Sequence, residues 1–203
     1  MSLCPEKILF LPGASGNTHF WRPAADFLRT PLPTQQLGWP GFGDVPRNTT
    51  INSLQDLAGL ALEQIDRPTA LVAQSMGGVV AVQVALQRPE LISHLVLSVT
   101  SGGLDVSALG GEDWRDEFAA DFPTLPRWFL DDRTDFSARL HELRMPVMLV
   151  WGGRDRISPL RVGQRLAELI PGARLEVFAE AGHDLGFTHA QAVARLIDQH
   201  LSV

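Results

Sequence analysis

The sequence predicts an α/β protein in which helices cover both faces of a mostly parallel sheet. Residues 95–99 and 147–151 are unbroken apolar runs, which is typical of strands buried on both faces of a parallel sheet. Segments with helical periodicity separate the apolar runs, and this alternation is typical of strand–helix–strand units. At 203 residues the chain is most simply one domain, large enough to bury a core without disulfide bonds.

The amino-terminal half of the chain alternates between predicted strands and predicted helices. Residues 8–11 form a short apolar run that Pro12 and Gly13 end, which indicates a strand and a turn. A helix is predicted over residues 21–29, and residues 35–37 form a weaker strand. The next helix begins at Asn52, with Gln55 as its capping partner, and apolar residues then recur on one face as far as Ile65. Residues 70–74 are the next strand, and residues 76–87 are the helix after it.

The carboxyl-terminal half continues the alternation after one long interruption. Residues 95–99, 147–151 and 175–178 are predicted strands, and residues 159–170 and 190–201 are predicted helices, the last of them amphipathic. Residues 101–143 are aromatic and acidic and contain no convincing strand. We therefore expect a single domain over residues 1–203 with a small insertion at about residues 101–143.

Composition argues against several classes of function. A net charge of −6 provides no basic surface for nucleic acid or acidic lipid. Cys4 is the only cysteine, and no apolar run is long enough for a signal peptide or a membrane span, so we expect a cytoplasmic protein. The chain has no tyrosine, and Lys7 is its only lysine. A tyrosine acid–base residue, a phosphate-loop lysine and a Schiff-base lysine are therefore not expected.

One serine has the sequence surroundings of a nucleophile. The apolar run that starts at Leu71 ends at Ser75, and a second apolar run of helical character follows directly. Ala73 and Gly77 stand two positions before and after the serine, so the pattern is G-x-S-x-G with alanine in place of the first glycine. A sharp strand-to-helix turn strains the backbone at the serine and brings strand and helix close together, which explains both small residues. We expect Ser75 to project its hydroxyl toward a substrate.

A nucleophilic serine needs a histidine to accept its proton and a carboxylate to orient that histidine. Asp155 follows a buried strand and two glycines, so we expect it at the carboxyl edge of the sheet, where ligands bind in open α/β sheets. His183 comes after the next strand, behind Ala181 and Gly182, and belongs to the same edge. The chain order Ser75, Asp155, His183 predicts a catalytic triad.

Each of these residues also has a structural interpretation. Asp155 could only cap the following helix, although a serine nearer that helix is better placed, and a lone histidine is more often structural. Asp105, in the loop after residues 95–99, is the main rival for the acid. Asp184 cannot easily orient the ring of its own neighbour. The set of His183, Asp184 and His189 has no recognised metal-ligand spacing, so we expect no metal there. A serine mechanism needs neither a metal nor an organic cofactor, and we expect none.

Acyl transfer also needs hydrogen-bond donors for the developing oxyanion. The backbone N–H of Met76, directly after Ser75, is the first predicted donor. The loop after the first strand supplies the second, because Gly13 and Gly16 let it fold tightly, and we assign the N–H of Ala14. A nucleotide-binding loop is the alternative, but the loop has neither G-x-G-x-x-G nor a following Gly-Lys pair.

With these motifs the chain resembles a small member of the α/β-hydrolase superfamily over essentially its whole length. The segment from Ala73 to Gly77, the loop of Asp155 and the loop of His183 match the catalytic positions of that superfamily, whereas Pro12 replaces a common histidine. The resemblance implies a trimmed sheet of about six strands, because the chain has no room for the leading antiparallel hairpin of many members. It also implies a short lid at residues 101–143 and a turn without chemistry at residues 37–44.

The predicted lid is the best indication of the substrate. Aromatic residues of the lid and of the oxyanion loop form the predicted substrate-binding set, which is Phe20, Trp21, Trp114, Phe118 and Trp128. Such a set suits an uncharged acyl or aromatic group. An alternative with equal support is that the aromatic residues of the lid only form the core of the lid.

The sequence therefore predicts a serine hydrolase that cleaves a carboxylic ester or thioester of a small uncharged or hydrophobic molecule through an acyl-enzyme. Its partner is a small-molecule substrate, with neither nucleic acid nor membrane involved. One alternative is lyase, synthase or carbon–carbon hydrolase chemistry on the same triad. Another is a non-catalytic binding protein that keeps the pocket.

Overall fold

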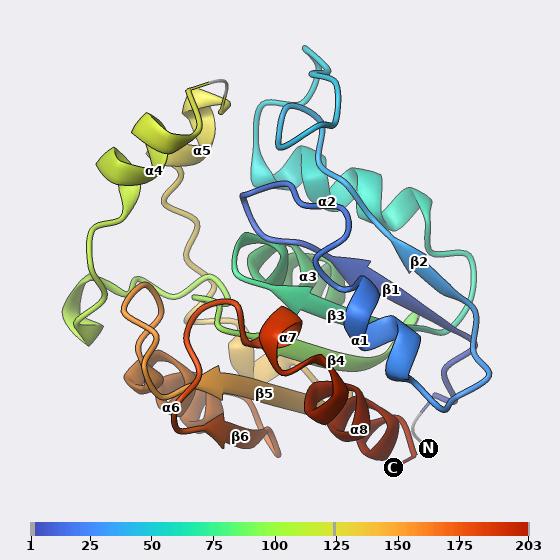
Figure 1. Ribbon diagram of the computed structural model, residues 1–203. Helices are drawn as coiled ribbons and strands as arrows, with labels where there is room; N and C mark the ends of the chain where they lie inside the picture. The colour runs from blue at the N-terminus through green and yellow to red at the C-terminus, as the bar shows by residue number, and fades with distance from the viewer. Residues whose placement is uncertain (1–2, 124, 203) are drawn as a thin grey trace.

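The computed structural model describes residues 3–123 and 125–202 and contains one six-stranded sheet (Figure 1). The strands are β1 (Lys7–Leu11), β2 (Thr34–Gln36), β3 (Thr69–Gln74), β4 (Ile92–Ser98), β5 (Val147–Gly152) and β6 (Arg174–Phe178). They lie in the order β2-β1-β3-β4-β5-β6, and every neighbouring pair is parallel. The predicted α/β fold class and the expected six strands are confirmed.

Helices cover both faces of this sheet. The helices of the sheet layers are α1 (Arg22–Phe27), α2 (Leu54–Glu63), α3 (Met76–Gln87), α6 (Leu160–Leu169), the single-turn α7 (Leu185–Thr188) and α8 (Ala190–His200). Helix α1 packs against α8 on one face, and α2 packs against α3 on the other (Figure 1). Every residue of β3, β4 and β5 is buried as a result, which explains their unbroken apolar runs. Among the described residues, no helix has the length and apolar character to cross a membrane.

Residues 101–143 connect β4 to β5 through short helical segments. These are η1 (Ser107–Leu109), α4 (Arg115–Asp121), α5 (Arg127–Asp131) and η2 (Leu140–Glu142), and α4 and α5 stand away from the sheet (Figure 1). Phe42, in the loop after β2, packs edge-on against Trp128 and Phe129 at 5.9 and 5.6 Å between ring centroids. Glu112 pairs with Arg156 in the loop after β5. The segment, called the lid below, thus contacts the loops after β2 and β5.

The cap of α2 differs from the predicted Asn52–Gln55 pair, which is wrong by one residue. Ser53 is the N-cap, and its hydroxyl oxygen accepts the N–H of Asp56 at 3.1 Å. The Asp56 carboxylate in turn accepts the N–H of Asn52 at 2.9 Å. Gln55 is occupied elsewhere, because its side-chain oxygen accepts a hydrogen bond from Gln83 on α3. The cap is therefore formed by Ser53 and Asp56, while the Gln55 side chain contacts α3.

Candidate active site

Ser75 lies on the sharp turn between β3 and α3, at the carboxyl edge of the sheet. Its backbone has φ 53° and ψ −123°, a conformation that residues with a side chain rarely adopt. Strand and helix approach closely here, because a Cβ at Gly77 would lie 2.5 Å from the carbonyl oxygen of Pro12. Ala73 is fully buried. This packing accounts for the small residues on both sides of Ser75.

Asp155 and His183 form a hydrogen-bonded pair at the same edge. The Nδ1 atom of His183 lies 2.7 Å from Oδ2 of Asp155. The other carboxylate oxygen accepts the N–H groups of Ile157 and Ser158, each at 2.9 Å. These bonds hold the fully buried carboxylate in one orientation. The His183 side chain is 20% exposed, so its ring remains accessible to a ligand.

Gln74, directly before Ser75, connects this elbow to the histidine loop. Its side-chain amide donates to the backbone carbonyl of His183 at 3.4 Å. Its Oε1 atom lies so close to Gly13 that a Cβ there would collide with it. The histidine loop is therefore in contact with the residue that precedes Ser75. Within the described part of the chain, no hydrogen bond joins the serine hydroxyl to the His183 ring. Such bonds are often long in ligand-free enzymes and shorten when substrate binds.

The carboxylate beside the His183 ring belongs to Asp155 and not to either rival. Asp105 is exposed in the loop after β4. Asp184 occupies the N-cap position of α7 and is exposed. The capping alternative for Asp155 is partly right, because one of its oxygens holds the turn before α6 while the other faces the histidine.

The two predicted oxyanion donors belong to the residue after Ser75 and to the loop that abuts Ser75. The loop after β1 abuts the elbow, since a Cβ at Gly13 would lie 3.1 Å from the Cβ of Ser75. Neither Ala14 nor Met76 donates its N–H to a backbone carbonyl among the residues that the structure describes. Both residues are buried. Backbone donors without a protein acceptor, next to the serine, are what an oxyanion hole requires.

Two buried indoles brace the loop after β1, and one of them, Trp39, is not among the site residues predicted from the sequence. The Nε1 atom of Trp39 donates to the carbonyl of Pro12 at 2.8 Å, and that of Trp21 donates to the carbonyl of Leu11 at 3.1 Å. These contacts support a bracing role for Trp21 in place of the predicted substrate contact. A tryptophan flanked by glycine and proline within a turn was the available sequence signal for Trp39.

The other predicted substrate-binding residues lie in two places. Phe20 packs edge-on against Trp21 at 5.2 Å and is largely buried. Trp114, Phe118 and Trp128 belong to the lid, where the first two rings contact each other at 5.5 Å and Trp128 contacts the loop after β2. The lid aromatics therefore pack mainly on protein, and substrate contact by them stays a prediction.

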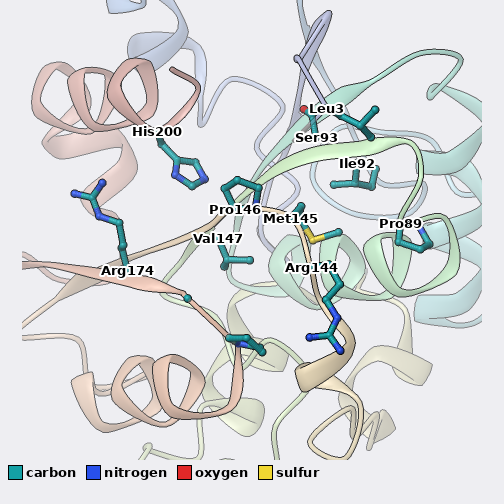
Figure 2. Close-up of a pocket in the computed structure, with 12 residues that line it drawn as sticks. Leu3, Pro89, Ile92, Ser93, Arg144, Met145, Pro146, Val147, Arg174 and His200 are labelled. Atoms are coloured by element: carbon teal, nitrogen blue, oxygen red, sulfur yellow. The ribbon is translucent and has the colours of Figure 1, made fainter. Parts of the chain in front are cut away.

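A cavity of about 630 Å³ lies at the opposite edge of the sheet from Ser75 (Figure 2). Ile92, Val147 and Arg174 line it, and they stand at the amino ends of β4, β5 and β6. Figure 2 shows the ring of His200 directed toward this cavity. The cavity lies at the edge opposite Ser75 and the Asp155–His183 pair, so it takes no part in the candidate active site.

Comparisons with known proteins agree with the fold described above. A family model described as "Alpha/beta hydrolase family" matches residues 8–142, and one described as "alpha/beta hydrolase fold" matches residues 128–190. The chain is 28% identical to a pimeloyl-acyl-carrier-protein methyl ester esterase of Neisseria meningitidis serogroup B, over 94% of this chain and 91% of that protein. It is 26% identical to a 2-hydroxy-6-oxononadienedioate/2-hydroxy-6-oxononatrienedioate hydrolase of Paraburkholderia phymatum, over 92% and 82%. The crystal structure of a hydrolase from Pseudomonas aeruginosa PA01 matches with a TM-score of 0.82 at 23% identity, over 98% and 91% of the two chains.

Proposed function

Because the chain belongs to the alpha/beta hydrolase family, we propose that it is a serine hydrolase that cleaves a carboxylic ester or thioester through an acyl-enzyme. Ser75 is the proposed nucleophile, His183 the general acid–base and Asp155 the acid that orients His183. One observation carries the proposal, which is the 2.7 Å contact between Nδ1 of His183 and the buried Asp155 carboxylate, at the sheet edge where the strained Ser75 also lies. A histidine held through Nδ1 presents Nε2 as a proton acceptor.

The proposed reaction has two steps. The Oγ atom of Ser75 attacks the carbonyl carbon of the ester while Nε2 of His183 accepts the hydroxyl proton. The N–H groups of Met76 and Ala14 stabilise the oxyanion, and His183 then donates its proton to the leaving alcohol. In the second step His183 takes a proton from water, and the resulting hydroxide attacks the carbonyl carbon of the acyl-enzyme. The bond from that carbon to Oγ then breaks, the carboxylic acid is released, and His183 returns the proton to Oγ of Ser75. Asp155 stabilises the imidazolium in both steps.

The proposed substrate carries a small uncharged or hydrophobic acyl group. The aromatic residues of the lid and the net charge of −6 support an uncharged group over an anionic one. The methyl ester esterase among the relatives supports ester chemistry as the first reaction to assay.

The Ser75→Ala variant tests this function with p-nitrophenyl acetate and butyrate. We expect kcat to fall by about 10⁴-fold or more with the melting temperature retained, because only the attacking oxygen is removed. Ser137→Ala, which removes a hydroxyl in the lid, is the control and should keep full activity. A fluorophosphonate probe should label the native protein at Ser75. Full ester turnover by Ser75→Ala, or absence of labelling, would rule out the serine mechanism, and the latter result would favour the binding-protein alternative.

A second candidate is carbon–carbon bond hydrolysis by the same residues. The relative from Paraburkholderia phymatum is named a 2-hydroxy-6-oxononadienedioate/2-hydroxy-6-oxononatrienedioate hydrolase, and this favours the candidate specifically. A spectrophotometric assay with such a compound, run beside the ester series, separates the two reactions. Turnover of the dienedioate that depends on Ser75, without turnover of esters, would select carbon–carbon hydrolysis.

A further inference from the structure

The turn after β4 lies against the elbow and has no role in the reaction proposed above. Val99 has φ 43°, and among the described residues it shares a positive φ with only one other non-glycine residue, Ser75. A positive φ is an outlier for a β-branched side chain. Thr100 follows directly and is 1% exposed. The strained turn therefore delivers a buried threonine to a position beside the nucleophile.

Thr100 contacts the backbone of Ser75. Its hydroxyl donates to the Ser75 carbonyl oxygen at 2.6 Å and accepts the N–H of Gly102 at 3.0 Å. The same Ser75 carbonyl accepts the N–H of Gly78 at 2.9 Å. Gly78 leaves room for the threonine, because a Cβ at that position would lie 2.5 Å from the Thr100 hydroxyl oxygen. Two donors thus fix the direction of the Ser75 carbonyl.

That carbonyl belongs to the same planar peptide group as the N–H of Met76. Fixing the carbonyl therefore fixes the N–H, which points in the opposite direction. A hydrogen bond accepted by a peptide carbonyl also polarises the peptide group and strengthens its N–H as a donor. The Thr100 hydroxyl consequently acts, through one peptide group, on the proposed oxyanion donor.

Thr100 is also connected to the acid loop. The hydroxyl of Ser158 donates to the Thr100 carbonyl at 3.3 Å, and the N–H of Ser158 donates to Oδ1 of Asp155 at 2.9 Å. The second oxygen of Asp155 faces His183. One series of hydrogen bonds therefore extends from the elbow to the acid–histidine pair.

We propose that Thr100 is a positioning residue that orients and polarises the peptide group between Ser75 and Met76 for oxyanion stabilisation. This inference rests on the proposed serine-hydrolase function. It predicts an effect on kcat and not on KM, because the oxyanion develops only after the substrate is bound.

Thr100→Val removes the hydroxyl and keeps the volume, and Thr100→Ser restores a hydroxyl. The matched control is Thr69→Val, since Thr69 is equally buried and its hydroxyl donates to the Arg67 carbonyl at 2.8 Å, at the other end of β3. With p-nitrophenyl butyrate we expect Thr100→Val to lose about tenfold in kcat with KM within about twofold. Thr100→Ser should stay within about threefold of the native protein, and Thr69→Val should keep native kcat per folded molecule. A native kcat in Thr100→Val would overturn the proposal.

The amide resonance of Met76 in a ¹H–¹⁵N NMR spectrum provides a readout that needs no turnover. Its proton signal should move upfield in Thr100→Val, where the peptide group is less polarised, and stay in place in Thr69→Val. If the native protein neither hydrolyses esters nor is labelled at Ser75, the proposed function fails. The Met76 signal still decides the positioning role in that case, and an unmoved signal overturns it. Should Thr100→Val not fold, Thr100→Cys, with a weak S–H donor in a similar volume, carries the same expectations.

Discussion

Single residues of the candidate site are held in place before any ligand binds. Both carboxylate oxygens of Asp155 are occupied, one by two backbone N–H groups and the other by the His183 ring. Ser75 keeps a strained backbone because the close packing of strand and helix leaves no room to relax. Groups fixed in this way need little reorganisation when charge develops in the transition state.

Asp155→Asn tests the carboxylate with almost no change of shape. The amide oxygen can still accept the N–H groups of Ile157 and Ser158, which leaves an NH₂ donor facing Nδ1 of His183. The ring then takes the tautomer with the proton on Nε2 and cannot accept the serine proton, so kcat should fall by about 10⁴-fold with little loss of melting temperature. Asp105→Asn, the same change at the exposed rival, should keep the native kcat. An equal loss in both variants would contradict the assignment of the acid.

At the scale of the elements, neighbouring loops shape one another across the carboxyl edge of the sheet. Gly16 in the loop after β1 packs against the backbone of Phe42 and Gly43 in the loop after β2. Trp39 of the second loop also donates to the Pro12 carbonyl of the first. The loop that bears the proposed donor at Ala14 therefore depends on a segment more than twenty residues later in the chain.

Trp39→Phe tests this dependence. The change leaves the buried Pro12 carbonyl without its donor, so we expect a loss of about 1–3 kcal/mol in the free energy of unfolding. The kcat for esters should also fall, because the loop around Ala14 loosens. Trp128→Phe is the control for stability, since the Trp128 indole N–H has no acceptor among the described residues. Urea unfolding measures the stability of both variants, and ester kinetics measure the kcat of Trp39→Phe. An equal loss of stability in the two variants would contradict the bracing role of Trp39.

The cap of α2 provides an independent test of local structure. Ser53→Ala removes the acceptor for the Asp56 N–H and should cost about 1 kcal/mol of unfolding free energy. Asn52→Ala should cost less, because the Asn52 side chain only donates to the exposed Thr49 carbonyl. Neither change should affect kcat. Thermal unfolding measures both costs. A larger cost for Asn52→Ala than for Ser53→Ala would support Asn52 as the cap, as predicted from the sequence.

Across the whole molecule, the amino edge of the sheet contains a buried histidine far from the candidate site. The pKa of His200 is lowered to about 4, mainly by burial and in smaller part by the nearby His94 and Arg174. The rings of His200 and His94 lie 5.2 Å apart in an edge-on arrangement. His200 is therefore neutral in the folded protein at neutral pH.

This lowered pKa predicts how stability depends on pH. Above pH 6.5 the imidazole is neutral in both the folded and the unfolded chain. Between pH 6.5 and about 4 the unfolded chain binds a proton that the folded protein does not, so stability falls as pH falls. The contribution across this window is about 3 kcal/mol. In urea unfolding at pH 4.5 to 7.5, the free energy of unfolding of His200→Phe should fall less steeply with decreasing pH than that of the native protein. His141→Gln, at an exposed position, should keep it, and an unchanged slope in His200→Phe would contradict the assignment.

Patterns along the sequence determined the fold class and the candidate residues of the site. Apolar runs without alternation identified β3, β4 and β5, because a strand that is buried on both faces has apolar residues on both faces. The small residues around Ser75 and the glycines before Asp155 and His183 marked the loops at the carboxyl edge, since tight turns need them locally. Each of these signals lies within a few residues of the feature that it predicts.

Only the tertiary structure decided which groups meet. It placed Asp155 and not Asp105 beside His183, and it directed the Trp21 indole to the Leu11 carbonyl. It also set the Thr100 hydroxyl on the Ser75 carbonyl. Most of these partners lie far apart in the sequence, and a hydrogen bond between them exists only when the packing of the sheet and its loops brings a donor within about 3 Å of an acceptor. The periodicity of apolar and polar residues along the sequence gives no information about these donor–acceptor distances.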